Sequence, residues 1–248
     1  MTLAEILAPT CALFLDFDGT VVDIAPQPEA VRVPAPLLDT LAMLRDYLGG
    51  AVAVISGRPI EQIDALLEPL KLPLAGVHGA ERRGAGGEVT LLSTHPLELV
   101  EQAAVALARE HPGLLIETKR GSLALHYRQA PALEALCVAT MQAAVEQSPG
   151  LTLLRGKMVV EAKPGGASKG RAIEAFMKEP PFAGRVPLFI GDDVTDEVGF
   201  STVQRLGGLG IKVGDGHTVA WRRLRDPAQL RDELRAALAA RTISGAST

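Results

Sequence analysis

The sequence of 248 residues has few cysteines, no excess of basic residues and no long uncharged run. Its two cysteines, Cys11 and Cys137, stand in separate apolar segments without a second cysteine or histidine at the spacing of a metal site. We therefore expect two buried thiols in a reducing compartment. Lys and Arg number 25 against 29 Asp and Glu, which gives a net charge of −4 and argues against binding to nucleic acid.

The chain also lacks the features of a membrane or exported protein. The longest segments free of Asp, Glu, Lys and Arg are residues 47–57 and 135–145, and both are shorter than the roughly 20 residues of a membrane span. Near the N-terminus, Glu5 stands where a signal peptide would carry a basic residue, and the following apolar run ends at Asp16 without a small-residue cleavage site. We expect a cytoplasmic protein that binds neither membrane nor nucleic acid.

The composition, 47% hydrophobic and 22% charged, is that of a globular protein, and the apolar segments alternate between strand and helix lengths. The pattern predicts strands at 12–15, 51–55 and 74–77, with helices at 36–48 and 60–70 between them. The same alternation returns at 169–240. The strands are continuous apolar runs, which is typical of a parallel sheet covered by helices on both faces.

The middle of the chain has a different pattern. Strand-like segments at 89–92, 114–119, 123–128, 151–154 and 158–161 surround helix-like segments at 97–109 and 133–147. Two of these strands are joined by the turn Arg120-Gly121-Ser122, which predicts a hairpin and an antiparallel sheet. We therefore predict two domains: a parallel-sheet core at 1–80 plus 163–248, and an inserted lobe at 81–162.

Carboxylates follow two of the predicted core strands. Asp16 and Asp18 come directly after the first strand, and Asp192, Asp193 and Asp196 come after the strand VPLFI. A single Asp-Gly pair would be an ordinary turn. Two acidic clusters at the same sheet edge, however, repel each other unless a cation lies between them, and ligands of open α/β sheets bind at this edge. The oxygen-only set favours Mg²⁺ over zinc.

A hydroxyl and two cations come from other element ends. Ser56 and Arg58 follow the second strand, and Lys169 begins a helix after the inserted lobe. Taken singly, Ser56 could be a helix cap, and the two basic residues could be solvated surface charges. Taken together beside a metal, they suit an anion with several exposed oxygens, which indicates a phosphate group.

The order Asp16-x-Asp18-Gly19-Thr20, Ser56, Lys169, Gly191-Asp192-Asp193 resembles the four motifs of haloacid-dehalogenase-like (HAD-like) phosphatases. The strings DFDGT, SGR, VHGAE, KPGGASKG and GDDVTDE resemble the trehalose-6-phosphate phosphatase family over about residues 12–240. The resemblance implies a HAD-like Rossmannoid parallel-sheet core with an inserted α/β cap domain. It also implies a Mg²⁺-dependent phosphatase that converts trehalose 6-phosphate to trehalose and phosphate, as in trehalose biosynthesis.

The resemblance further implies a role for each matching residue. Asp16 would be the nucleophile that forms an aspartyl-phosphate, and Asp18 would be the acid and then the base. Lys169 and Ser56 would hold phosphoryl oxygens. The Mg²⁺ ligands would be the Asp16 and Asp192 carboxylates and the Asp18 carbonyl, with Asp193 and Asp196 behind them. The implied substrate-binding residues are Thr20, Arg58, His78, Gly79, Glu117, Lys119, Arg128, Lys157 and Glu161.

Other interpretations stay open at this point. Glu117 and Lys119 could be a surface charge pair, and His78 could be a buried histidine with a structural partner. A related sugar phosphatase, acting for example on sucrose phosphate or mannosylglycerate phosphate, would carry the same core. A phospho-accepting regulatory domain is disfavoured, because it needs neither Asp18 as a proton shuttle nor so large an insertion. A small-molecule substrate and a monomer are expected.

Overall fold

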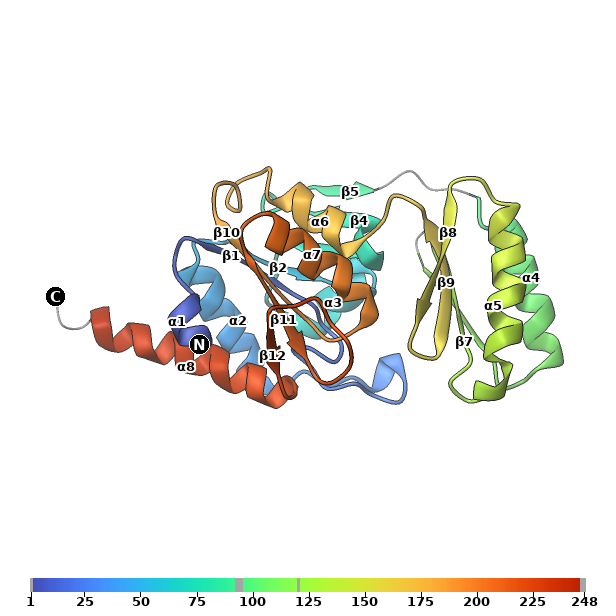
Figure 1. Cartoon of the computed structure of the whole chain (residues 1–248), viewed down its shortest axis with the longest axis horizontal. Coiled ribbons are helices and arrows are strands. Elements are labelled where there is room, and N and C mark those ends of the chain that lie inside the picture. Colours follow the sequence, from blue (N-terminus) through green and yellow to red (C-terminus); the bar gives the residue numbers. More distant parts are fainter. Residues whose placement is uncertain (1, 92–95, 120, 246–248) are drawn as a thin grey trace.

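A computed structural model describes residues 2–91, 96–119 and 121–245, and within them the chain forms two lobes side by side along its long axis (Figure 1). Each lobe contains a β-sheet with helices packed against it. The larger lobe holds both ends of the described chain, and the middle of the chain forms the smaller one. This arrangement confirms the predicted α/β fold with a parallel-sheet core and an inserted cap.

The strands of the larger lobe are β1 (Cys11–Leu15), β2 (Val52–Ile55), β3 (Leu74–Gly76), β4 (Glu81–Arg83), β5 (Val89–Leu91), β10 (Val186–Gly191), β11 (Leu209–Val213) and β12 (Arg222–Leu224). Its α-helices are α1 (Leu3–Ile6), α2 (Ala35–Tyr47), α3 (Ile60–Leu67), α6 (Lys169–Phe176), α7 (Glu197–Arg205) and α8 (Pro227–Gly245). Three short 3₁₀ helices accompany them: η1 (Pro28–Ala30), η2 (Val77–Gly79) and η4 (Val194–Asp196). The sheet order is β12-β11-β10-β1-β2-β3-β4-β5, parallel from β12 to β3.

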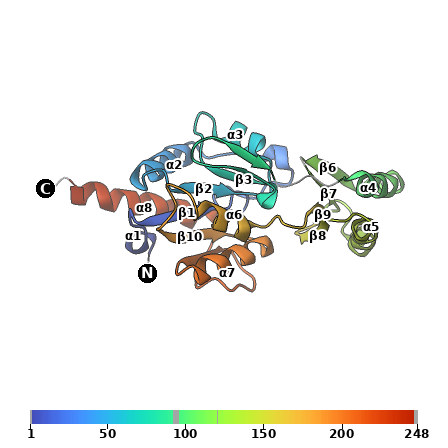
Figure 2. The same ribbon diagram turned by 90° about the horizontal axis from the view of Figure 1, so that it is seen from above.

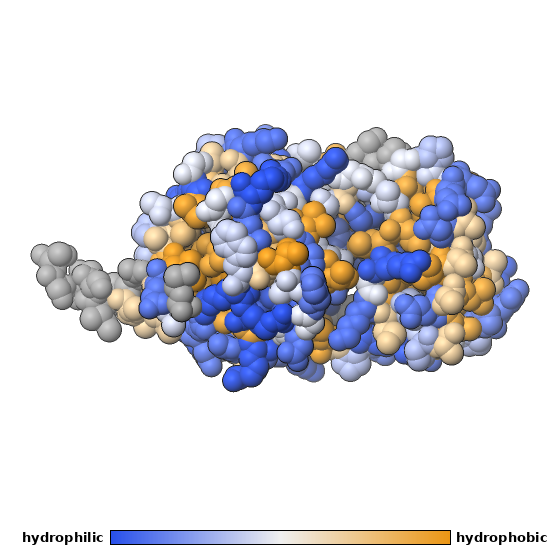
Figure 3. All heavy atoms as spheres, viewed as in Figure 1, coloured by the Kyte–Doolittle hydropathy of each residue, from blue (hydrophilic) through white to orange (hydrophobic). Residues whose placement is uncertain are grey.

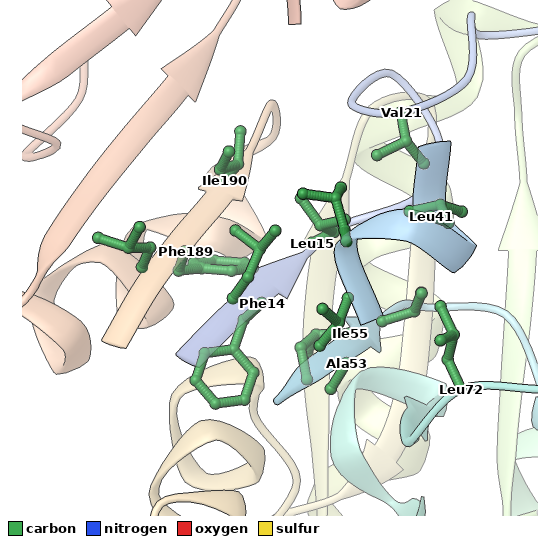
Figure 4. Close-up of a cluster of buried hydrophobic side chains, with 14 of the residues drawn as sticks. Phe14, Leu15, Val21, Leu41, Ala53, Ile55, Leu72, Phe189 and Ile190 are labelled. Carbon is green, nitrogen blue, oxygen red and sulfur yellow. The ribbon is translucent and has the colours of Figure 1, made fainter. Parts of the chain in front are cut away.

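The central strand β1 lies between β10 and β2, and all of its residues are buried. Successive side chains of a strand point to opposite faces, so each face of β1 needs its own apolar cover. Phe14 packs against Phe176 of α6 with 5.9 Å between ring centroids, whereas Leu15 lies on the side of Leu41 from α2 (Figure 4). Apolar packing on both faces explains why the strand sequences are continuous apolar runs. It also holds each strand in place and so positions the residues that follow it.

The smaller lobe contains β6 (Leu115–Lys119), β7 (Ser122–His126), β8 (Leu151–Gly156) and β9 (Val159–Pro164), with the helices α4 (Glu98–Glu110), α5 (Glu134–Glu146) and η3 (Pro131–Leu133). Its sheet has the order β6-β7-β9-β8 and is antiparallel. Helices α4 and α5 cover the outer face, and the sheet lies between them and the core (Figures 1 and 2). The inner face of this sheet is thereby turned toward the larger lobe.

The boundary between the lobes differs from the prediction at one end. The predicted insertion begins at residue 81, but β4 pairs antiparallel with β3, and β5 pairs antiparallel with β4, so both strands extend the larger sheet. The reason is the glycine-rich turn between them, where Gly87 has a φ of +87° and lets the chain fold back on itself. The insertion thus starts after Leu91. Leu92 of the predicted strand and Arg120 of the predicted turn lie outside the described residues.

The surface mixes polar and apolar side chains over both lobes (Figure 3). Hydrophobic residues are visible in the region of α7 on the face shown, where Val194 and Val198 are more than half exposed. Among the described helices, none combines the length and the apolar character that crossing a membrane would require.

Candidate active site

The acidic residues meet at the carboxyl edge of the larger sheet. Asp16 follows β1, Asp192 follows β10, and Asp196 lies in η4. One carboxylate oxygen from each of the three lies within 4.8 Å of the others. The Thr20 hydroxyl lies 3.0 Å from Asp16 Oδ2 and 3.2 Å from Asp192 Oδ1, so it bridges the two strand ends. The ends of two neighbouring parallel strands and the short helix η4 therefore bring three carboxylates together.

Gly19 makes this approach possible. Its φ is +81°, and a Cβ atom at this position would lie 2.2 Å from Asp192 Oδ2. The turn after Asp16 is closed by a hydrogen bond from the Gly19 N–H to the Val22 carbonyl at 2.8 Å. A side chain at residue 19 would therefore both strain the turn and push Asp192 away from Asp16.

Lys169 is a buried cation in the middle of the cluster. It is the first residue of α6, whose N-terminus is capped by the Ser168 hydroxyl. Its Nζ donates to Asp16 Oδ1 at 2.6 Å and to Asp196 Oδ1 at 2.7 Å. Burial alone would lower the pKa of Lys169, but the charges of Asp16 and Asp196 raise it above its ordinary value. Lys169 is therefore held as a fixed positive charge beside Asp16.

One ammonium does not balance three carboxylates. Burial raises the pKa of Asp16 to about 7 despite the opposing charge of Lys169. Burial and the charge of Asp196 raise the pKa of Asp192 to about 6, and burial raises that of Asp196 to about 6. In their ionised forms the three buried carboxylates outnumber the one ammonium, and a bound divalent cation would relieve this surplus of negative charge.

The donor set separates candidate ligands from supporting residues. Asp196 uses Oδ1 for Lys169 and Oδ2 for the N–H groups of Asp192 and Asp193, at 3.0 and 2.9 Å. Asp16 and Asp192 face each other with oxygen atoms only, which is the donor chemistry of Mg²⁺. The cluster could thus hold a metal ion, with Asp196 orienting the loop that carries Asp192.

A second polar group lies beside the cluster at the end of β2. The Ser56 hydroxyl is buried and accepts a hydrogen bond from the Arg58 N–H at 3.0 Å. The Arg58 guanidinium donates to both oxygens of Asp18, at 2.6 and 2.8 Å. The side chain predicted to bind substrate is therefore paired with the predicted acid, a contact that sequence spacing does not reveal.

The inner face of the smaller sheet carries a linked set of charges around Glu161 of β9. Its carboxylate accepts from the Ser122 hydroxyl at 2.6 Å and lies 3.6 Å from Lys119 Nζ and 3.3 Å from His78 Nε2. Burial would raise the pKa of Glu161, but the charge of Lys119 and the contacts with His78 and Ser122 lower it to about 2. Glu161 is therefore a buried carboxylate held in its ionised form.

Glu117 and Lys119 of β6 belong to the same cluster. Glu117 Oε2 lies 2.9 Å from His126 Nε2 and 3.7 Å from Lys119 Nζ. Burial would raise the pKa of Glu117, but the hydrogen bond from His126 and the charge of Lys119 hold it below its ordinary value. These side chains face the other lobe, because Lys119 Nζ donates to the Gly57 carbonyl of the core at 3.2 Å. They are thus more than a pair of solvated surface charges.

The lobes also meet through His78, which contacts Glu161 from the core side. His78 has a φ of +54° and follows Val77 at +49°, so two non-glycine residues occupy the left-handed region. This is costly for a β-branched residue and is found most often at functional sites. Gly57 leaves room for the imidazole, since a Cβ there would lie 2.7 Å from His78 Nε2.

A cavity of about 610 Å³ lies between the lobes and joins the two polar groups. The predicted site residues that line it are Asp16, Asp18, Ser56, Arg58, His78, Glu117, Lys119, Arg128, Lys157, Glu161, Lys169, Asp192 and Asp193. Thr20 and Asp196 support the cavity from behind the residues that line it. Gly79, with a φ of +97°, packs against Ser168 instead, where a Cβ would lie 2.9 Å from the carbonyl oxygen.

Several polar residues of the site were not predicted, among them Gln27, Glu29, Ser122, His126, Gln129 and Thr195. Two more are Lys212 and Gln62. Lys212 of β11 donates through Nζ to the Asp192 carbonyl and so supports the acidic loop from a neighbouring strand. Gln62 of α3 lines the cavity. Neither carries a signal in a single sequence, since a lysine in an apolar strand and a glutamine on a helix are both common.

The fold and the site define the class of the protein: a HAD-like fold, with a parallel-sheet core that carries an acidic site and an inserted cap. The acidic cluster, Ser56 and Lys169 lie at the carboxyl edge of the parallel sheet, and the cap faces them across the cavity. Within this class, the chain belongs to the trehalose-phosphatase family, whose family model matches residues 14–227. This result confirms the resemblance that the sequence motifs indicated.

Known proteins agree with this assignment. The chain is 46% identical over 220 residues to the trehalose-6-phosphate phosphatase of Escherichia coli strain K12, a match that covers 87% of this chain and 82% of that protein. It is also 46% identical over 205 residues to a probable trehalose-phosphate phosphatase of Sinorhizobium fredii, covering 82% and 77% of the two chains. The C-terminal domain of the Candida albicans trehalose-6-phosphate phosphatase has the same fold, with a TM-score of 0.85, 23% identity and coverage of 94% and 93%.

Proposed function

We propose that this protein hydrolyses trehalose 6-phosphate to trehalose and inorganic phosphate. The observation that carries the proposal is the single cavity that joins the acidic cluster and Lys169 on one side to the charged cluster around Glu161 on the other. Its volume of about 610 Å³ lies in the range typical of small-molecule sites. The name and the 46% identity of the Escherichia coli relative support trehalose 6-phosphate in particular.

Asp16 is the nucleophile in this proposal. Its carboxylate attacks phosphorus in line with the sugar oxygen, the bond between phosphorus and that oxygen breaks, and an aspartyl-phosphate forms. Asp18 gives a proton to the departing sugar oxygen and then removes one from the water that attacks the intermediate. That second attack breaks the bond between Asp16 and phosphorus and releases phosphate.

Arg58 and Lys169 handle the negative charge of the phosphoryl group. Arg58 is paired with Asp18 without substrate, so this pair must open before Asp18 can carry a proton. An arriving phosphate dianion offers Arg58 a stronger partner than one carboxylate. Binding of the phosphate would therefore release Asp18 for proton transfer, while Lys169 and Ser56 contact phosphoryl oxygens.

Mg²⁺ is the implied cofactor, and the Asp16 and Asp192 carboxylates and the Asp18 carbonyl would hold it. When bound, it supplies positive charge that keeps Asp16 ionised and stabilises the phosphoryl oxygens. Residues of the chain shape the site for the ion. Gly19 leaves room for the Asp192 side chain, and hydrogen bonds from Asp192 N–H to Asp196 and from Lys212 to the Asp192 carbonyl orient the Asp192 backbone. Asp193 lines the cavity next to Asp192 and would contact water around the metal.

The cap provides the sugar contacts. Glu117, Lys119 and Glu161 line the cavity with fixed charges, and Arg128 and Lys157 add positive charge to its wall. Charged groups that are already oriented form strong hydrogen bonds to hydroxyls.

We place the enzyme in the cytoplasm, in keeping with its two buried cysteines that form no disulfide. We expect it to act as a monomer on a free sugar phosphate.

The test is a panel of phosphate esters assayed for phosphate release with Mg²⁺. The panel contains trehalose 6-phosphate, sucrose 6-phosphate, mannosylglycerate phosphate, glucose 6-phosphate and an aryl phosphate. We expect the highest kcat/KM for trehalose 6-phosphate, by at least about tenfold, the effect of a single good polar contact. A higher value for another sugar phosphate would contradict the proposed substrate, and no phosphate release from any ester would contradict the reaction.

A further inference from the structure

Gln62 is a polar residue of the cavity that has no part in the proposed mechanism. It lies in the first turn of α3, four residues after Arg58, and its side chain lines the cavity together with residues of both lobes. Its Oε1 atom is buried and has no hydrogen-bond partner within the described part of the chain. Of the charged groups in the same cavity, Asp18 is paired with Arg58 and Glu161 with Lys119. The Nδ1 atom of His78 is the other buried atom of a lining residue that has no partner among the described residues.

An unpartnered buried carbonyl oxygen costs free energy, because it has given up water without gaining a donor. Such a group is rare in folded proteins and needs an explanation, and a ligand that supplies the missing partner is one explanation for a residue that lines a cavity. The position of Gln62 fits that explanation: the cavity wall beside it contains Arg58, which is proposed to bind phosphate, and the cap residues proposed to bind sugar. Because the Gln62 side chain lines the cavity, a rotation of its carboxamide toward the cavity would bring the buried Oε1 to a hydroxyl donor of the ligand.

We propose that Gln62 is a specificity-determining residue that binds a hydroxyl group of the disaccharide from the core side. The inference rests on the proposed function, since it takes a sugar phosphate as the substrate. A carboxamide presents an acceptor and two donors in one plane, so it can accept from one sugar hydroxyl and donate to its neighbour. The core would then hold the sugar as well as the phosphate, and the cap would close over the other side.

The experiment compares Gln62→Leu with the wild type on trehalose 6-phosphate and on an aryl phosphate, which has the phosphoryl group but no sugar hydroxyls. Leucine nearly conserves volume and removes both hydrogen-bonding groups. We expect kcat/KM for trehalose 6-phosphate to fall about 5- to 20-fold, as for one or two neutral hydrogen bonds. The fall should come mainly from a higher KM, and kcat/KM for the aryl phosphate should stay within about twofold.

Thermal unfolding separates binding from a structural role. If Gln62 is kept for the ligand, removing its unpartnered carbonyl should leave Tm unchanged or raise it by up to about 4 °C in a chain of this size. Gln142→Leu is the matched control, because Gln142 lies on the exposed face of α5 and bonds Glu146 at 3.0 Å. Gln62→Met, which is unbranched, replaces the leucine variant if that protein does not fold.

The outcomes distinguish this inference from the proposed function. If the wild type hydrolyses trehalose 6-phosphate and the kcat/KM of Gln62→Leu for this substrate lies within twofold of the wild-type value, the role of Gln62 is overturned and the proposed function stays intact. An equal loss on both substrates, or a Tm lowered by more than about 4 °C, would show a structural role and overturn the inference as well. If the wild type prefers another sugar phosphate, the proposed substrate fails, and the same comparison on the preferred ester decides the role of Gln62.

Discussion

Glu161→Gln tests whether the cap holds a preformed charge cluster. In the wild type, Glu161 is 4% exposed and is surrounded by Lys119, His78 and Ser122. Its pKa falls from 4.5 to about 2, which corresponds to roughly 3 kcal/mol of stabilisation at pH 7, at about 1.4 kcal/mol for each pKa unit. Glutamine keeps the shape but leaves the Lys119 ammonium buried beside a neutral partner.

The sign of the pH dependence follows from the lowered pKa. A carboxylate with a depressed folded-state pKa contributes its stability above pH 4.5 and loses it as the pH falls toward 2. Urea unfolding of Glu161→Gln should therefore show a deficit of about 3 kcal/mol at pH 7 that shrinks to about half at pH 3. Glu146→Gln, on the exposed surface of α5, should stay within about 0.5 kcal/mol of the wild type.

Two results would refute this reasoning. A deficit below about 1 kcal/mol at pH 7 would mean that the charges around Glu161 do not stabilise its ionised form. A deficit of the same size at pH 7 and pH 3 would mean that the loss comes from packing, because packing does not titrate in this range.

Three further predictions concern the site. Asp18→Asn should lower kcat by about 10²–10⁴-fold if Asp18 moves the proton, and a loss of less than about tenfold in steady-state phosphate release would point to another acid. Lys119→Ala should lower kcat/KM for trehalose 6-phosphate by about 10- to 150-fold while small aryl phosphates lose little, as one charge-assisted hydrogen bond predicts; a parallel loss on both substrates would indicate a role in closure or folding. In chelator, Tm should decrease as the pH rises from about 4 to 7.5, because Asp16 and Asp192 have pKa values raised to about 7 and 6, and raised carboxyl pKa values contribute stability that is lost as pH rises through them. Mg²⁺ should restore Tm more at pH 7.5 than at pH 5, and an equal shift at both pH values would contradict the charge argument.

The residues that sequence reasoning located are those whose position depends on short-range order. Asp16, Ser56 and Asp192 directly follow buried apolar strands, and a parallel sheet brings such strand ends together whatever the detail of its packing. Lys169 was placed by its position at the start of a helix. Motif, strand end and helix start are all visible within a few residues, so the acidic cluster and Lys169 could be predicted.

What could not be predicted depends on contacts between distant segments. Nothing local shows that Arg58 turns to Asp18, or that β4 and β5 continue the larger sheet instead of opening the insertion. The bond from Lys212 to the Asp192 carbonyl and the unpartnered Gln62 likewise appear only once the strands and lobes are packed. For Glu117 and Lys119, spacing alone favoured a surface pair, and their contacts across the cap sheet and to the core decide otherwise.

The most direct test of the account is to look for the phosphoryl group on Asp16 during turnover of trehalose 6-phosphate. Wild-type protein with Mg²⁺ and phosphate-labelled substrate is quenched in acid at early times, digested, and examined for a labelled peptide that contains Asp16. The account predicts transient label on that peptide with the wild type, none with Asp16→Asn, and phosphate release by the variant at background. Near-normal phosphate release by a folded Asp16→Asn variant, or label on a different residue, would contradict it.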